Sequence, residues 1–160
     1  SPGQLIREAG VDALSFGATK NGAAVGDAVV FFDKEAACEF EYRCKQAGQL
    51  ASKMRYLAAP WVSLLDDDLW LRNARHANLM AEKLHGQLTE IPQVRTLAPR
   101  EANSVFVKLS EASRQALHAK GWRFYVLLGK DGYRLMCSWD TNDEDVDEFV
   151  ADLSEALVAE

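Results

Sequence analysis

The spacing of apolar positions changes along the chain and predicts an order of short strands and helices. Two apolar runs between Asp12 and Asp33, Ala13–Phe16 and Ala28–Phe32, indicate strands. Because both runs are almost uninterrupted, we predict a sheet that is covered on both faces. The segment between them, GATKNGAAVG, is rich in glycine and predicts a turn.

Helical spacing follows in two segments. Lys34–Lys45 predicts a first helix, and a polar linker, residues 46–49, separates it from a long helical region over Met54–Leu88. Pro60 lies near the beginning of this region, where proline either kinks a helix or marks its start.

The last third of the chain mixes strands with two helices. In order, the expected elements are a strand at Val94–Leu97, an alternating strand at Ser104–Leu109, a helix at Glu111–Lys120 ending at Gly121, a hairpin at Arg123–Trp139 and a final helix beginning near Asn142. Asp131-Gly132 predicts the tight primed turn of the hairpin. Thr141 and Glu144 have the spacing of a capping box for the final helix.

Charge adds little to this pattern. The 160 residues include 18 Lys and Arg against 24 Asp and Glu, and nine of the acids fall in residues 140–160, on the polar side of the final helix. The remaining segment has no basic block, so nucleic-acid binding is not expected. We also find no apolar stretch of about 18 residues and no leader pattern, which predicts a soluble, cytoplasmic protein without a membrane span.

Metal chemistry is not predicted. The cysteines, Cys38, Cys44 and Cys137, lack the pair spacing of zinc or redox motifs, so we expect reduced, partly buried thiols. The histidines, His76, His85 and His118, lie far apart in the sequence, and we interpret them as solvent-exposed helical residues.

The segment Leu14–Gly22 carries the main candidate for chemistry, Lys20. A lysine directly after a buried strand can lie in a compact cavity that desolvates its ammonium group and lowers its pKa. Such an amine can act as a nucleophile. The spacing alone leaves a second interpretation open, in which Lys20 is a surface residue of a polar turn.

Four stretches together resemble one enzyme family. They are VDALSFGATKNG, EFEYRCKQAGQLASKMRYLAAPW, LWLRNARHANLMAEKL and YRLMCSWDT. In this order they resemble the carboxy-terminal half of the low-specificity L-threonine aldolases, which belong to the β-eliminating lyase group of fold-type I pyridoxal 5'-phosphate (PLP) enzymes. The resemblance implies an α/β fold in which residues 1–75 are the remainder of the large PLP-binding domain. Residues 76–160 would hold the end of the connecting helix and a small α+β domain with a hairpin.

The resemblance also implies roles for individual residues. Lys20 would form the Schiff base with PLP, and Arg134 would bind the substrate α-carboxylate. Lys45 and Arg55 match basic positions near the cofactor phosphate, while Thr19 and Asn21 flank the lysine and would help to place it. His76 is our in-chain candidate for an indirect role, since the resemblance puts the proton acceptor outside this chain.

The implied activity is cleavage of L-threonine or allo-threonine-type β-hydroxy-α-amino acids to glycine and an aldehyde. We expect a homodimer or homotetramer, and a chain that needs the amino-terminal half of the same enzyme and is inactive alone. One alternative is another fold-type I PLP lyase, such as a phenylserine aldolase. A second alternative is a non-catalytic interaction module.

Overall fold

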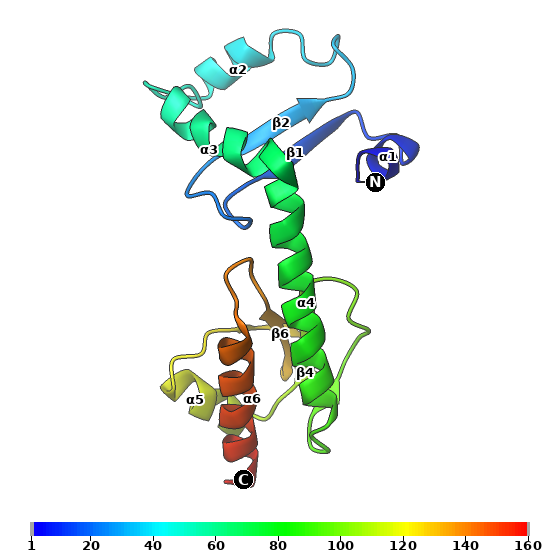
Figure 1. The fold of residues 1–160 in the computed structure, drawn as a ribbon, viewed down its shortest axis with the longest axis vertical. Coiled ribbons are helices and arrows are strands. Elements are labelled where there is room, and N and C mark those ends of the chain that lie inside the picture. The colour runs from blue at the N-terminus through cyan, green and yellow to red at the C-terminus, as the bar shows by residue number, and fades with distance from the viewer. Residues whose placement is uncertain (1, 160) are drawn as a thin grey trace. The chain divides into compact units, whose positions relative to one another are not determined.

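The computed structural model describes residues 2–159, which divide into two compact units. The first unit extends to Trp70, and the second begins at Leu71. The elements of the first unit are α1 (Pro2–Glu8), β1 (Ala13–Gly17), β2 (Asp27–Phe31), α2 (Phe40–Gln46), α3 (Arg55–Leu65) and the 3-10 turn η1 (Asp66–Asp68). Those that follow are α4 (Leu69–Thr89), β3 (Arg95–Thr96), β4 (Ser104–Lys108), α5 (Glu111–Ala119), β5 (Tyr125–Leu128), β6 (Gly132–Met136) and α6 (Asp143–Val158) (Figure 1).

The first unit contains an antiparallel pair of strands, β1 and β2, in the register Ala13 to Phe31. The predicted strands are confirmed, but the prediction of a sheet covered on both faces is wrong for the described residues. Val29 and Val30 of β2 remain 41% and 37% exposed, because the two strands form a sheet of their own. Only small clusters pack against it, one of them the contact of the Phe31 ring with Phe40 of α2.

The helices of the first unit differ from the prediction at two points. The helix expected from Lys34 begins only at Phe40, since Glu39 has a φ of 63°, which a helix interior does not allow. The long region breaks not at Pro60, which lies inside α3, but at η1, where Asp67 has a φ of 49°. Proline removes one helical hydrogen bond, whereas aspartate tolerates the left-handed backbone that ends α3.

The second unit is built on a four-stranded antiparallel sheet in the order β3-β4-β6-β5. Alternation along β4 turns Val105 and Val107 toward the core, and Tyr133 and Leu135 of β6 lie on the same side. Buried residues of α4, α5 and α6 complete this core, among them Leu88, Leu117 and Leu153. The three helices therefore pack on one face of the sheet, and no helix of residues 2–159 covers its other face (Figure 1).

The hairpin of β5 and β6 is confirmed, but its turn is not the predicted one. Leu128 pairs with Gly132, so the loop has three residues, and its left-handed residue is Gly129, with a φ of 62°. Gly132 lies within β6, where a Cβ atom would collide with the Leu128 carbonyl oxygen and approach Leu128 Cβ at 2.8 Å. This glycine is required by a close approach of the backbone rather than by a positive φ.

The final helix begins where expected, with different capping residues. Asn142 is the N-cap, its side-chain oxygen accepts the Asp145 N–H at 2.9 Å, and Asp145 Oδ2 accepts the Asn142 N–H at 2.9 Å. The predicted pair Thr141 and Glu144 is therefore wrong by one residue. Thr141 instead accepts the Ser138 N–H on its hydroxyl oxygen at 2.8 Å, which ties the turn before the helix. No helix within residues 2–159 is long and apolar enough to cross a membrane.

Candidate active site

Lys20 lies within a short turn, residues 19–22, that follows β1. The Ala18 carbonyl accepts the N–H groups of Asn21 at 2.9 Å and Ala23 at 3.1 Å, which closes the turn. Gly22 has a φ of 107°, a conformation that favours glycine, which explains the glycine two residues after the lysine. The local sequence thus places Lys20 at a defined point of the backbone.

Packing holds this turn against the helices of the same unit. Ala18 and Ala23 are buried with Leu64, and Trp61 and Leu69 pack against this cluster. Asn21 donates from its side-chain amide to the Trp70 carbonyl oxygen at 3.0 Å. Phe16, two residues before Ala18, contacts the rings of Trp61 and Trp70 at centroid distances of 5.4 and 5.3 Å. Packing and a hydrogen bond therefore hold the backbone of the Lys20 turn, whereas the Lys20 side chain itself is exposed.

Lys20 and Thr19 are both exposed. The enclosed cavity expected around the lysine is not formed by the described residues, because the strand before it is only half covered and no element lies over the turn. Two further basic candidates of the same unit are also exposed. Lys45 lies in the last turn of α2, and Arg55 is the first residue of α3, its guanidinium 5.2 Å from the centre of the Tyr56 ring.

Arg134 belongs to the second unit, at the middle of β6 on the open face of the sheet. Its cross-strand partners are Phe106 on β4 and Tyr125 on β5. No carboxylate of residues 2–159 lies within ion-pair distance of its guanidinium. An unpaired guanidinium between aromatic neighbours is suited to binding a planar anion from solution.

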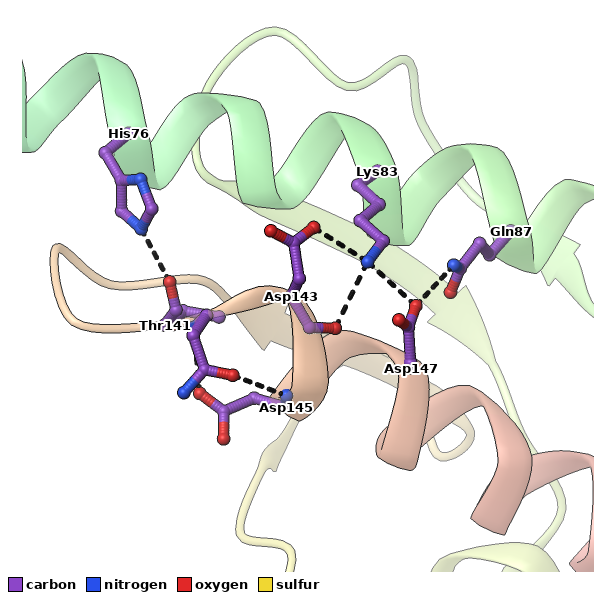
Figure 2. Close-up of polar contacts among 8 residues, drawn as sticks. His76, Lys83, Gln87, Thr141, Asp143, Asp145 and Asp147 are labelled. Carbon is purple, nitrogen blue, oxygen red and sulfur yellow. Dashed lines mark hydrogen bonds and ion pairs between the residues drawn. The ribbon is translucent and has the colours of Figure 1, made fainter.

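His76 is half-buried rather than solvent-exposed, and His85 and His118 are half-buried as well, which corrects the prediction from sequence. Figure 2 shows His76 on α4 directed at the Thr141 carbonyl oxygen, with Nε2 at 2.6 Å from it. Since a carbonyl only accepts, Nε2 carries the hydrogen and donates it. The contact fixes the turn that connects β6 to α6.

A second polar contact near this turn joins α4 to α6. Lys83 Nζ lies 2.8 Å from Asp143 Oδ1 and 2.8 Å from Asp147 Oδ1, and Gln87 donates to Asp147 at 2.7 Å (Figure 2). The hydrogen bonds that Lys83 donates to Asp143 and Asp147 raise the pKa of Lys83, so the ammonium stays charged. The start of α6, immediately after the turn, is thereby held to α4.

The cysteines carry free thiols. Cys137, at the end of β6, is buried, and its burial raises the pKa of the thiol to about 11. Cys44 is half-buried, whereas Cys38 is exposed, which departs from the prediction that all three are partly buried. Among the described residues no group of three His, Cys, Asp or Glu side chains gathers as a metal site would.

Two features of these sites were not predicted. The tryptophans Trp61 and Trp70 support the Lys20 turn from two different helices, and their spacing across the helix break carries no local signal. Phe106 and Tyr125 lie on either side of Arg134. The sequence did not predict these neighbours, because it did not give the order in which the strands pair.

Comparison with known proteins places the chain in a family. The family model of the β-eliminating lyases matches residues 4–112. The chain belongs to the β-eliminating lyase family. The resemblance seen in the sequence is therefore confirmed.

Individual members of the β-eliminating lyase family are similar over almost the whole chain. The low-specificity L-threonine aldolase of Pseudomonas sp. strain NCIMB 10558 is 53% identical and matches 99% of this chain, and that of Pseudomonas aeruginosa is 56% identical and matches 96%. A solved structure of threonine aldolase from Leishmania major superposes with a TM-score of 0.80 at 26% identity, over 90% of this chain and 43% of that one. The expected α/β fold class is confirmed. The chain spans about half the length of the curated relatives, 46% and 44%.

Proposed function

We propose that this chain is the carboxy-terminal part of a PLP-dependent aldolase that cleaves L-threonine and allo-threonine-type β-hydroxy-α-amino acids to glycine and an aldehyde. The observation that carries the proposal is the identity of 53% and 56% to two low-specificity L-threonine aldolases, which extends over the Lys20 turn and the strand of Arg134. Residues 1–75 would then be the remainder of the PLP-binding domain. Residues 76–160 would be the small domain, and the remaining length of the relatives would supply the amino-terminal half.

The groups on this chain fit PLP by their chemistry. Lys20 offers an exposed primary amine, which the aldehyde of PLP requires, on a turn that packing and hydrogen bonds hold in place. Arg55 and Lys45 offer exposed cations for the phosphate, and Thr19 adds a hydroxyl beside the lysine. When bound, PLP supplies a sink for the electrons of the breaking Cα–Cβ bond.

Arg134 would bind the α-carboxylate of the amino acid through two parallel N–H···O hydrogen bonds. Its lack of an internal ion pair leaves both donors free for substrate, and a two-point contact fixes the orientation of the bond that breaks. His76 would act indirectly, because its hydrogen bond to Thr141 fixes the turn that follows the strand of Arg134. The base that accepts the β-hydroxyl proton would come from the amino-terminal half.

The decisive experiment tests Lys20. We would coexpress this chain with the amino-terminal half of the Pseudomonas aeruginosa relative, add PLP, record the absorbance, reduce with borohydride and map the labelled peptide. We expect a cofactor band and a label on Lys20, both lost in Lys20→Ala and retained in Lys34→Ala, an exposed lysine of the same unit. A label on another residue would overturn the assignment of Lys20, and the lack of any Lys20-dependent band would favour the non-catalytic interaction module.

Arg134 is tested by kinetics on the same complex. Removing a charged hydrogen-bonding partner costs about 1.5–3 kcal/mol, so we expect Arg134→Gln to raise KM for L-threonine by about 10–100-fold. Arg134→Lys should recover only part of this, since an ammonium lacks the planar pair of donors. An unchanged KM in Arg134→Gln would remove Arg134 from the site. Comparing L-threonine with phenylserine as substrates distinguishes the proposed activity from the related aldolase.

A further inference from the structure

A hollow of about 410 Å³ lies in the second unit between α5 and the edge strand β5. Glu111, Arg114 and His118 line it from α5, and Arg123, Lys130 and Tyr133 line it from the hairpin side. Arg134 is not among its lining residues, so this hollow is separate from the proposed carboxylate site on the open face of the sheet.

The hollow has an excess of positive charge. Its charged lining residues are three cations and one carboxylate, and that carboxylate, Glu111, is already paired. Arg114 donates from Nε to Glu111 Oε2 at 2.7 Å and makes a second contact from Nη2 to Oε1. Arg123 and Lys130 have no ion-pair partner among residues 2–159. Two uncompensated cations therefore remain beside the same hollow.

Arg123 is held in one orientation by the end of α5. Its Nη1 donates to the His118 carbonyl oxygen at 2.7 Å and to the Trp122 carbonyl oxygen at 2.8 Å. Both hydrogens of Nη1 are thereby used, and the N–H groups of Nε and Nη2 are left on one edge of the guanidinium. That edge has the geometry that binds the two oxygens of a carboxylate.

Tyr133 supplies the second observation. Its side chain is 2% exposed, and its ring packs on Phe124 at a centroid distance of 5.4 Å. No hydrogen bond joins its hydroxyl to another of residues 2–159, and Nε2 of His118, which also lines the hollow, is buried without a hydrogen-bond partner. Because Tyr133 lines the hollow, a ligand there would satisfy this hydroxyl.

We propose that the hollow between α5 and β5 binds a small organic carboxylate with a compact apolar body. Arg123 and Lys130 neutralise the carboxylate, and the Tyr133 hydroxyl hydrogen-bonds to it. Phe124 and Val126, which also line the hollow, contact the apolar body. This inference does not depend on the proposed aldolase activity.

Benzoate is the probe, with benzamide as its uncharged counterpart, and the readout is the ¹H–¹⁵N spectrum of the 160-residue chain. We expect saturable shift changes at the amides of Val126, Lys130 and Tyr133 with benzoate, and none that saturate with benzamide. Inorganic phosphate should bind more weakly than benzoate, because it offers no apolar body. Equal binding of benzamide, tighter binding of phosphate, or no saturable change up to about 20 mM benzoate, about twenty times a Kd of about 1 mM, overturns the proposal.

Variants locate the site. Arg123→Gln, Lys130→Ala and Tyr133→Phe should each raise the Kd for benzoate by at least about tenfold, since each removes a hydrogen bond or an ion pair to the charged carboxylate. Lys130 lies in the hairpin loop, so its replacement keeps the test valid if Arg123→Gln disturbs the end of α5. Arg100→Gln, which replaces an arginine paired with Glu82, is the matched control. A Kd that responds to Arg134→Gln but not to Arg123→Gln or Lys130→Ala would assign benzoate to the other site.

Discussion

The two units of this chain differ sharply in how they bury apolar surface. The second unit has one continuous core of fourteen buried residues drawn from α4, α5, α6, their connections and the sheet. The corresponding cluster in the first unit has three buried residues, Ala18, Ala23 and Leu64. Large apolar side chains of the first unit remain in contact with solvent, such as Leu5 at 70% and Val62 at 72% exposed.

Within residues 2–159, the second unit therefore gains more stabilisation from buried apolar side chains than the first unit does. Folding must offset a large loss of conformational entropy, and buried apolar surface is the main favourable contribution. An exposed apolar surface of this extent marks an interaction site on a soluble protein. The exposed apolar side chains of the first unit are consistent with our proposal that the remaining length of the relatives packs against it.

The largest expected effect on stability comes from removing a core side chain of the second unit. Leu153 of α6 is fully buried, so Leu153→Ala should lower the free energy of unfolding by about 2–5 kcal/mol. Val62→Ala in α3 should change it by less than about 0.5 kcal/mol, since Val62 is mostly exposed. Urea denaturation measures both. Equal costs for the two substitutions would contradict the contrast between the units.

A smaller effect is expected at a backbone contact in the same sheet. Gly132→Ala should destabilise the second unit by about 1–3 kcal/mol, because the new methyl group would overlap the Leu128 carbonyl group. Gly86→Ala in α4 is the matched control, since no atom lies within 4 Å of its Cβ position. It should stabilise the helix by about 0.5–1 kcal/mol. Native-state hydrogen exchange in β6 measures both, and a neutral Gly132→Ala would refute the close approach.

The N-caps of α6 in the second unit and of α2 in the first unit also differ. Asn142→Ala removes the acceptor for the Asp145 N–H and should cost about 1 kcal/mol of unfolding free energy. The residue at the same position before α2 in the first unit, Glu39, makes no side-chain capping hydrogen bond. Glu39→Ala should therefore cost less than about 0.5 kcal/mol. Denaturation midpoints of the two variants give the result, and a larger loss for Glu39→Ala would reverse our interpretation.

The smallest effect is electrostatic and lies on the surface of the second unit. Hydrogen bonds from Arg114 and then Gln115 lower the pKa of Glu111 from 4.5 to about 2. Because the folded-state pKa is depressed, the stabilisation from this carboxylate is present above about pH 4.5 and is lost as the pH falls through about 2. A carbon-13 NMR titration of the Glu111 carboxyl measures the midpoint, and Arg114→Gln should return it toward 4.5. A midpoint near 4.5 in the unchanged chain would contradict the contact.

The sequence predicted the elements better than their boundaries. Strands and helices of the second unit follow the expected order, because their apolar alternation matches the faces that the core buries. The break at Asp67 and the late start of α2 depend on single backbone conformations, which carry no periodic signal. The predicted capping pair was one residue too early. Thr141 and Asn142 are both favourable N-cap residues, so the sequence did not distinguish between them.

The candidate sites depended on different kinds of information. The sequence by itself made Lys20 a candidate and the family resemblance added Arg134, and both roles stay predictions. The sequence also indicated roughly where the chain turns, because glycine, proline and apolar spacing act within a few residues. Tertiary structure alone decided that Gly132 serves a close backbone contact, and that Arg123, Lys130 and Tyr133 line one hollow. These residues meet because β5 pairs with β6 in a particular register and the hairpin lies beside α5. Local spacing along a chain does not encode those distances.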